Sequence, residues 1–181
     1  ITEYEQLALD TIRSVSGNEN RYVVVPAYAC SDATVADYTL PVDSASDKMI
    51  YSFHAYSPYT FAMQKNSEGG HSNFTADDKN SIAWQFKTVR EVIDRQDKKV
   101  GIIIGEASAS NKGNLSDREA WFEYFFDESY NKYGYATFLW DNGNPDPEAD
   151  DGERHGYLNL SDNSWYFPTL IEKAHKSIYG E

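Results

Sequence analysis

The sequence predicts an α/β fold built on a small parallel sheet. Apolar runs of strand length alternate along the chain with amphipathic stretches of helical spacing. One run, residues 100–104, is apolar throughout, which is typical of a parallel strand covered on both faces. Strands that alternate with helices pair in parallel through right-handed crossovers. Four such strands fit either a small open sheet or half of an eight-stranded barrel.

The first half of the chain supplies one helix and two of these strands. Apolar residues at helical spacing precede Gly17, which is placed to end the helix; they are Ile1, Tyr4, Ala8, Ile12 and Val15. Residues 22–26 and 49–53 are the predicted strands. We expect long loops at residues 27–48 and 62–78, and long loops in compact domains are often functional.

The second half supplies the other two strands and three helices. The helix before strand 100–104 is marked by Ile82, Phe86, Val89 and Ile93. Ser116 and Glu119 have the spacing of a capping box and predict the start of the next helix. That helix carries a broad apolar stripe, Trp121, Phe122, Phe125 and Phe126. Residues 135–140 form the fourth strand, and the last helix carries Phe167, Leu170, Ile171, Ala174 and Ile178.

Four chemically active side chains lie at or just past the ends of three strands. They are His54, Tyr56, Glu106 and Trp140. Active sites of parallel α/β folds lie at the carboxyl ends of their strands. These four side chains can converge only if the sheet curls, and no glycine-rich phosphate loop follows any strand. The half barrel therefore fits better than an open nucleotide-binding sheet.

Composition limits the possible partners. The chain has 181 residues, enough for a core of its own, and we treat residues 1–181 as a single segment. Its net charge of −13 argues against nucleic acid and against an anionic membrane surface. Fourteen tyrosines and four tryptophans exceed what the core requires, so some rings are expected to face a ligand, as sugar binding needs. One cysteine excludes an internal disulfide.

The four strand-end residues have side chains that could act together on a sugar. Glu106 at the end of a dry strand could act as a nucleophile or as an acid–base group, and Tyr56 could hydrogen-bond it and keep it ionised. His54 could bind a hydroxyl group, and Trp140 offers an apolar face to a sugar ring. Each residue alone also has a structural interpretation, as a loop carboxylate, a hydrogen-bonded histidine or a core tryptophan. Their shared position at strand ends favours a site.

Three motifs in this order resemble glycoside hydrolase family 5 endoglucanases of the cellulase and xyloglucanase type. They are residues 52–59 (SFHAYSPY), 103–106 (IIGE) and 138–143 (FLWDNG). Residues 165–168 (WYFP) are similar to that family's approach to its last helix. The resemblance covers essentially the whole chain. It implies the C-terminal half of a (β/α)8 barrel, roughly strands 5 to 8 with helices 4 to 8.

The resemblance also implies roles for individual residues. Glu106 would be the catalytic nucleophile, and His54 and Tyr56 would bind the sugar and hold that nucleophile. Trp140 would stack on the sugar, and Tyr59 and Asn142 would line the cleft. The implied activity is that of a retaining endo-β-1,4-glucanase, secreted and without a cofactor, acting on cellulose, xyloglucan or related β-glucans.

The chain departs from the family's pattern in one essential respect. The family's acid/base glutamate lies in an Asn-Glu-Pro motif, and no such motif occurs here. We therefore expect the isolated chain to be inactive, and an N-terminal half barrel, as a preceding segment or a separate chain, or self-association, to complete it. Asp141 is a poor substitute because it follows Trp140 directly, and consecutive strand residues point to opposite faces.

Two further interpretations remain open. The chain could be a non-catalytic carbohydrate-binding or assembly fragment of such a barrel, or a flavodoxin-like domain without sugar chemistry. The acidic loop 144–154 could bind calcium through carboxylate oxygens, although it lacks the glycine-punctuated spacing of a known calcium loop. The alternative for that loop is a solvated surface; its acidic residues are Asp146, Glu148, Asp150, Asp151 and Glu153.

Overall fold

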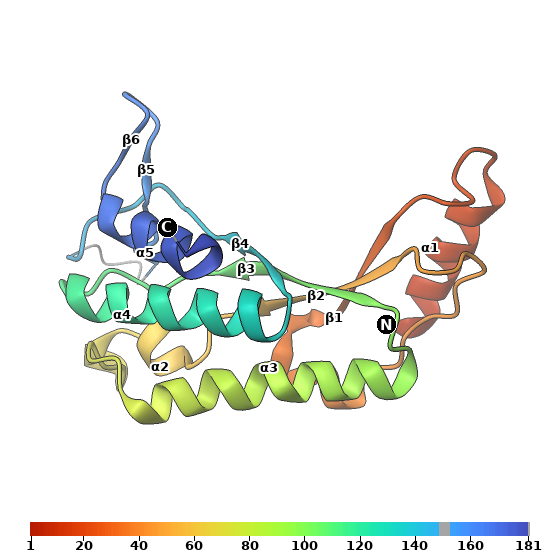
Figure 1. Cartoon of the computed structure of the whole chain (residues 1–181), viewed down its shortest axis with the longest axis horizontal. Helices are drawn as coiled ribbons and strands as arrows, with labels where there is room; N and C mark the ends of the chain where they lie inside the picture. Colours follow the sequence, from red (N-terminus) through yellow and green to blue (C-terminus); the bar gives the residue numbers. More distant parts are fainter. Residues whose placement is uncertain (149–152, 181) are drawn as a thin grey trace.

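Four parallel strands form the centre of the fold, in the same order in space as in sequence (Figure 1). The structure, a computed structural model, describes residues 1–148 and 153–180. The strands are β1 (Val23–Ser31), β2 (Met49–Ala55), β3 (Gly101–Ala107) and β4 (Ala136–Leu139). Each crossover between them contains a helical segment, as the alternating sequence pattern predicts.

Two helices, α3 (Ala76–Gln96) and α4 (Leu115–Phe126), cover one face of this sheet, and α1 (Thr2–Ser14) stands beyond one end of it (Figure 1). A further helix, α5 (Pro168–Tyr179), packs on α4. Shorter segments are η1 (Asp32–Asp37), α2 (Tyr59–Ala62), η2 (Asn66–Glu68) and the π-helical η3 (Asp127–Lys132), with the β5–β6 hairpin (Leu158–Asn159, Ser164–Trp165). None of the helices in the described ranges combines the length and apolarity that a membrane span requires.

Aromatic side chains fill the layer between the sheet and its helices. Phe53 of β2 meets Phe86 of α3 edge to face at 6.1 Å between ring centroids, and Tyr135 before β4 meets Phe53 at 5.9 Å. Tyr135 also donates a hydrogen bond to the Phe86 carbonyl oxygen at 3.0 Å. Phe125 of α4 completes the cluster at 5.2 Å from Phe86. These contacts fix α3 and α4 against the same side of the sheet.

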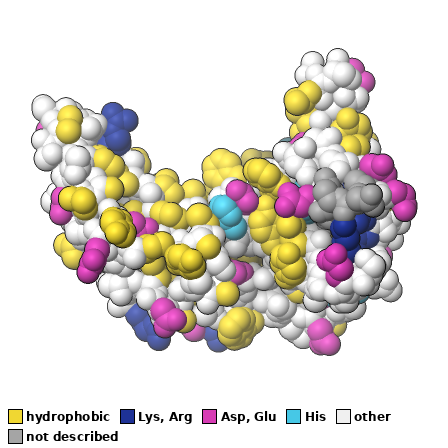
Figure 2. All heavy atoms as spheres, turned by 180° about the vertical axis from the view of Figure 1, so that it is seen from behind, with side chains coloured by type: hydrophobic (Ala, Val, Ile, Leu, Met, Phe, Trp, Pro, Cys, Tyr) yellow, Lys and Arg dark blue, Asp and Glu magenta, His cyan; other side chains and the backbone are white. Residues whose placement is uncertain are grey.

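The opposite face of the sheet is largely uncovered. Val24 of β1 is 49% exposed and Phe138 of β4 is 58% exposed, and Ile103 of β3 is only partly buried. Figure 2 shows apolar side chains across a hollow between two projecting arms. The prediction that residues 100–104 are buried on both faces is therefore wrong for this chain. The helices cover only one face, because the described residues place no second layer on the other.

Helix boundaries differ from the sequence expectation in two places. Ser116 and Glu119 do not form the predicted capping box, because α4 begins at Leu115 after Asn114 and Ser116 lies inside the helix. A capping box does form at α3, where Thr75 accepts from the Asp78 backbone and Asp78 accepts from the Thr75 backbone. The helix α3 therefore starts inside the predicted loop 62–78.

Strand boundaries also extend beyond the apolar runs. Strand β1 continues to Ser31 and is followed by η1, within the predicted loop 27–48. Strand β3 continues through Glu106, which therefore lies in the strand and not after it. The first helix is confirmed, but Leu9 is its buried residue, whereas Tyr4 of the predicted apolar face is exposed.

A buried ion pair joins α1 to the segment before β2. Arg13 Nε and Nη2 donate to the two carboxylate oxygens of Asp43 at 2.8 and 2.7 Å, and the side chains are only 6% and 5% exposed. Asp43 also accepts from the Ala45 backbone at 2.9 Å. The hydrogen bonds from Arg13 lower the pKa of the Asp43 carboxyl group below its usual range. This two-pronged pair holds α1 in place.

We expect Asp43→Asn to lower the free energy of unfolding by about 2 kcal/mol at pH 7, because Arg13 loses its charged acceptor. The wild-type pair contributes above the ordinary carboxyl pKa of about 3.9 and is lost as the pH falls through the lower, folded-state value. Urea unfolding at pH 7 and pH 3 should therefore show a difference between wild type and variant that shrinks in acid. Asp47→Asn, which removes an exposed carboxylate 3.6 Å from Lys99, is the matched control and should have little effect. Equal effects of the two substitutions would contradict the assignment.

Candidate functional site

The candidate site begins with a pair of side chains on neighbouring strands. His54 of β2 and Glu106 of β3 are register partners at the carboxyl ends of their strands. The His54 Nδ1 atom lies 3.2 Å from Glu106 Oε2, and both side chains are about 30% exposed, with values of 29% and 30%. The register therefore places a carboxylate and an imidazole side by side where solvent or a ligand can reach them.

Gly105 makes this approach possible. A Cβ atom at position 105 would lie 2.8 Å from Ser52 Oγ and 3.4 Å from the His54 ring. A methyl group there would therefore displace both side chains from the open face of the sheet. The glycine lets His54 lie against strand β3 and reach Glu106.

Tyr56 provides the second contact to Glu106. It follows the last residue of β2, and its hydroxyl donates to Glu106 Oε2 at 2.9 Å. Burial raises the pKa of the Tyr56 phenol well above its ordinary value, and the hydrogen bond to Glu106 raises it further. Tyr56 is therefore a permanent donor at neutral pH. The contacts that sequence analysis expected between Tyr56, His54 and Glu106 are present.

Two exposed aromatic residues lie at the same edge of the sheet. Trp140 follows β4 directly and is 38% exposed, and its backbone N–H donates to the Ala107 carbonyl oxygen at 3.0 Å. Tyr59 begins α2, after β2, and is 61% exposed. Their positions agree with a ligand-facing role, which stays a prediction because no ligand is present.

Asn142 and Asp141 are occupied by their own loop. Asn142 Nδ2 donates to the Glu153 carbonyl oxygen at 2.7 Å, and its Oδ1 accepts from the His155 backbone at 3.1 Å. Asp141 Oδ2 accepts from the backbones of Tyr157 and Leu158 at 3.2 and 2.8 Å. Both side chains shape the loop after β4. The expected role of Asn142 in substrate binding therefore stays a prediction without geometric support.

The backbone that follows Glu106 is buried and held at every step. The carbonyl oxygen of Ala107 accepts from Trp140, the Ser110 N–H donates to the Ala62 carbonyl oxygen at 2.8 Å, and the Asn111 N–H donates to that of Arg154 at 2.8 Å. Residues 107–111 are all buried. Glu106 is thus attached to a rigid segment, which is what a precisely placed reactive group needs.

Sequence analysis missed a buried polar cluster behind this segment. Ser108 Oγ lies 2.7 Å from both His155 Nδ1 and Tyr157 Oη, and the Arg118 Nε donates to the Ala109 carbonyl oxygen at 3.1 Å. Small polar residues after a strand and a histidine within an irregular loop carry no periodic signal. Their proximity depends on the path of the loop after β4, which a single sequence does not reveal.

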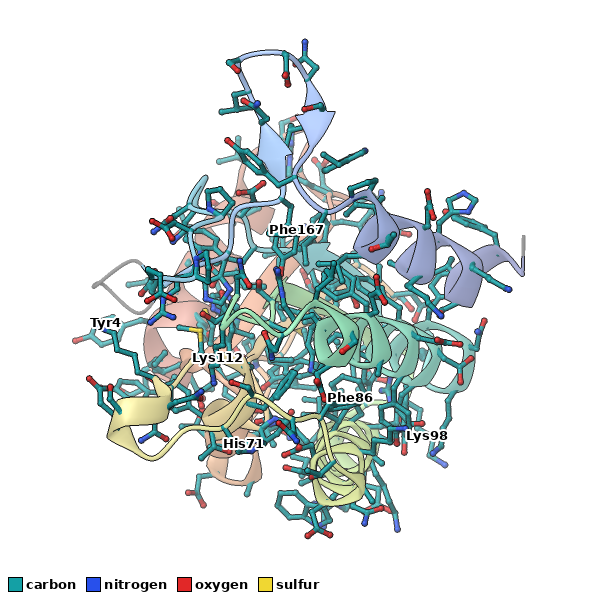
Figure 3. All side chains as sticks on the ribbon, turned by 90° about the vertical axis from the view of Figure 1, so that its left-hand side faces the viewer. Tyr4, His71, Phe86, Lys98, Lys112 and Phe167 are labelled. Atoms are coloured by element: carbon teal, nitrogen blue, oxygen red, sulfur yellow. The ribbon has the colours of Figure 1, made fainter. Side chains whose placement is uncertain are left out.

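Lys112 connects two of the loops at the same edge. Its Nζ donates to the carbonyl oxygens of Thr60 and His71 at 2.9 and 3.0 Å, and Figure 3 shows Lys112 and His71 close together. Burial lowers the pKa of Lys112 to about 8, and the nearby charge of Arg154 adds to this effect. The loop after β2 is therefore fixed to the segment after β3.

The described residues offer no cluster of three or more histidine, cysteine or carboxylate side chains that could hold a metal ion. The calcium hypothesis for the acidic loop depends partly on Asp150 and Asp151, which lie outside the described residues. The part of that loop which is described uses its polar side chains to shape the backbone; for example, Asp146 accepts from the Glu148 backbone at 2.9 Å.

A carboxylate, an imidazole and aromatic rings at the carboxyl edge of a curled parallel sheet are the layout of a (β/α)-barrel enzyme. The chain belongs to the cellulase family, glycosyl hydrolase family 5, whose profile matches residues 1–146. Endoglucanase B of Neocallimastix patriciarum is 35% identical over 98% of this chain. Endoglucanase A of Clostridium longisporum is 33% identical over the whole chain.

Solved structures support the same assignment. The GH5-4 broad specificity endoglucanase from Clostridium longisporum superimposes with a TM-score of 0.86 at 32% identity, over 99% of this chain and 50% of that one. One from Ruminococcus champanellensis with bound cellotriose gives a TM-score of 0.82 at 32% identity, covering 96% and 48%. A family 5 lichenase variant from Caldicellulosiruptor sp. F32 in complex with cellotetraose gives 0.87 at 28% identity, covering 98% and 48%.

The chain spans 36% and 35% of the length of the two endoglucanases named first, and about half of each solved chain. The matched portion is the C-terminal part of family 5 barrels. The predicted family and the predicted partial barrel fold are therefore confirmed. The flavodoxin-like alternative is set aside by the same matches.

The contact between Tyr56 and Glu106 can be tested by titration. We expect Tyr56 to stay protonated at pH 11, where an ordinary tyrosine with a pKa of about 10 has ionised. Glu106→Gln should lower the Tyr56 pKa, because the phenolate would no longer face a carboxylate. NMR of 13Cζ-labelled tyrosine, assigned with Tyr56→Phe, measures this. Glu123→Gln, at an exposed carboxylate paired with Lys173, is the control and should leave Tyr56 unchanged. A Tyr56 signal that is indifferent to Glu106→Gln would rule out the contact.

Proposed function

We propose that this chain supplies the nucleophile half of a retaining endo-β-1,4-glucanase that acts on cellulose, xyloglucan or related β-glucans. The observation that carries the proposal is the Glu106 carboxylate with Tyr56 and His54 on one oxygen, at the carboxyl edge of a family 5 sheet. The names of the relatives and the oligosaccharides bound in the similar structures support the substrate class. A polymeric substrate also favours a secreted parent enzyme.

The two contacts to Glu106 suggest which of its oxygens reacts. Tyr56 and His54 both approach Oε2, so Oε1 is the oxygen left to attack the anomeric carbon. The attack forms a glycosyl–Glu106 ester while a second carboxylic acid protonates the departing sugar oxygen. Water then attacks the anomeric carbon while the second carboxylate takes its proton, the ester bond breaks, and Glu106 regains its negative charge. Tyr56 and His54 keep the carboxylate oriented, and Trp140 presents an apolar face to the sugar.

The second carboxylic acid must come from outside this chain in our proposal. Retaining hydrolysis needs two carboxyl groups about 5–5.5 Å apart, and the sequence contains no Asn-Glu-Pro motif. Strands β1 and β4 are the edges of the described sheet, and their Val24 and Phe138 side chains are exposed on its open face. An N-terminal half barrel would cover both features and add the acid/base group. Exposed edges and apolar faces otherwise favour self-association.

A chimera tests the nucleophile assignment. The N-terminal half of the Clostridium longisporum endoglucanase would be fused ahead of Ile1 and treated with a 2-deoxy-2-fluoro-cellobioside that carries a good leaving group. We expect mass spectrometry to find the label on Glu106. Glu106→Gln should abolish labelling and reduce turnover at least ~1,000-fold, as the loss of a nucleophile does elsewhere. Glu91→Gln, on the exposed side of α3, is the matched control. A label on another carboxylate would refute the assignment.

The isolated chain should turn over carboxymethylcellulose and xyloglucan negligibly, because half of the catalytic pair is missing. Reducing-sugar release by the purified chain, compared with the chimera at equal concentration, measures this. Sedimentation should show the isolated chain associating through its uncovered sheet face. Turnover at rates ordinary for enzymes would overturn the requirement for a second half. A stable monomer would count against an unsatisfied face.

A non-catalytic role is the second candidate function. The exposed rings of Trp140 and Tyr59 could bind a glucan without cleaving it, as a carbohydrate-binding or assembly fragment. Cello-oligosaccharide binding by the chain and by Glu106→Gln to the same extent, with a chimera that is folded but inactive, would favour this candidate. Turnover by the chimera would favour the enzyme.

A further inference from the structure

His155 is completely buried beside the tyrosine that contacts Glu106. Its ring centroid lies 6.2 Å from that of Tyr56, with the planes tilted by 56°, and its exposed fraction is 0%. The hydroxyl of Tyr56 reaches Glu106 Oε2. The Tyr56 ring is thus packed against the imidazole while its hydroxyl contacts the carboxylate.

A hydrogen bond joins His155 to the segment that directly follows the strand of Glu106. His155 Nδ1 lies 2.7 Å from Ser108 Oγ, and Ser108 is two residues after Glu106 and fully buried. The same Oγ lies 2.7 Å from the hydroxyl of Tyr157, which in turn donates to the Ala109 carbonyl oxygen at 3.2 Å. Ser108 Oγ therefore links the imidazole directly to the segment after Glu106, and it links Tyr157 to the same segment.

Arg118 of α4 is the next member of this buried polar cluster. Its guanidinium is fully buried, with its carbon 5.3 Å from the Tyr157 ring centroid and 4.6 Å from that of Phe167. Its Nε donates to the Ala109 carbonyl oxygen. Two aromatic faces and one carbonyl therefore keep Tyr157 and the 107–111 segment from separating.

A close backbone approach sets the position of His155 in the loop. Gly156 N–H donates to the Asn144 carbonyl oxygen at 2.7 Å, and a Cβ atom at Gly156 would lie 2.5 Å from the Pro145 nitrogen. The His155 N–H donates to Asn142 Oδ1. The loop after β4 thus folds back on itself, and these backbone hydrogen bonds fix the position of His155 in the interior.

We propose that His155 is a positioning residue that, together with Ser108, keeps the Tyr56 hydroxyl on Glu106. The inference rests on the proposed role of Glu106 as nucleophile. A tyrosine hydroxyl can orient a carboxylate only while its ring is prevented from turning, and an imidazole supplies both a flat packing face and a polar atom for Ser108. His155 belongs to the loop that begins at Trp140. It therefore connects this loop to Glu106, and it keeps Trp140, the proposed sugar-stacking residue, in a fixed position relative to Glu106.

The titration of Tyr56 in the isolated chain tests the packing without any need for catalysis. Burial is the main cause of the raised Tyr56 pKa, so His155→Ala should lower that pKa by admitting water to the ring. His175→Ala is the matched control, because His175 also packs on a tyrosine, Tyr179 at 4.7 Å, but on α5. It should leave Tyr56 unchanged. An unchanged Tyr56 titration in folded His155→Ala would overturn the proposal.

Kinetics of the chimera test the effect on the nucleophile. We expect His155→Ala to slow formation of the 2-fluoroglycosyl enzyme roughly 10- to 100-fold, with KM nearly unchanged, because a small displacement of a reacting group is costly to rate. A change in KM alone would overturn the proposal. His155→Asn keeps a polar atom toward Ser108 and His155→Phe keeps the ring, and each should recover part of the loss.

Ser108→Ala keeps the proposal testable if His155→Ala does not fold. It removes the hydroxyl group and should produce smaller changes of the same sign in both measurements; no change in either would overturn the proposal. If the Tyr56 titration shifts as expected but Glu106 is not labelled, the proposed function fails while the packing role of His155 is retained. If Glu106 is labelled equally fast in wild type and all His155 variants, the proposed function stands and the positioning role fails.

Discussion

The register between β2 and β3 is the constraint on which the candidate site depends. Parallel pairing aligns His54 with Glu106, and the irregularity in the ladder between Phe53 and His54 occurs where the site begins. A shift of one residue would turn His54 toward the helices and leave Glu106 beside an apolar side chain. On the covered face, the rings of Phe53, Phe86 and Tyr135 pack β2 against α3 and against the residue before β4.

The two faces of the sheet differ in how completely they are covered. Its helix-covered side is complete in aromatic packing, whereas the other side exposes the side chains that a closed barrel would bury. The edge that carries the candidate site is nonetheless ordered by contacts within the chain. Loops after β2, β3 and β4 are joined through Lys112, Trp140 and Arg154. Contacts among the described residues thus connect the loops at this edge.

The sequence predicted the elements and the contacts of Tyr56 and His54 with Glu106, but not the buried polar contacts behind them. Helical and strand periodicities report which residues face a core, so α1, α3 and the four strands were located from them. Glu106, His54 and Tyr56 were identifiable because strand ends share one edge. Ser108 and His155 are 47 residues apart and meet only through an irregular loop, for which periodicity gives no information. The capping box at Ser116 does not form because α4 begins two residues earlier than that box requires, after Asn114.

Gly105 limits where substitutions could stabilise this protein. A glycine inside a strand costs about 0.5–1 kcal/mol relative to a residue with a side chain, so a search for stabilising substitutions would choose this position early. A methyl group at this position would lie 2.8 Å from Ser52 Oγ and 3.4 Å from the His54 ring, so it would disturb the side chains next to Glu106. A substitution that stabilises the strand at this position would therefore come at the expense of the candidate site, and stabilising substitutions are better placed in the helices and their connections.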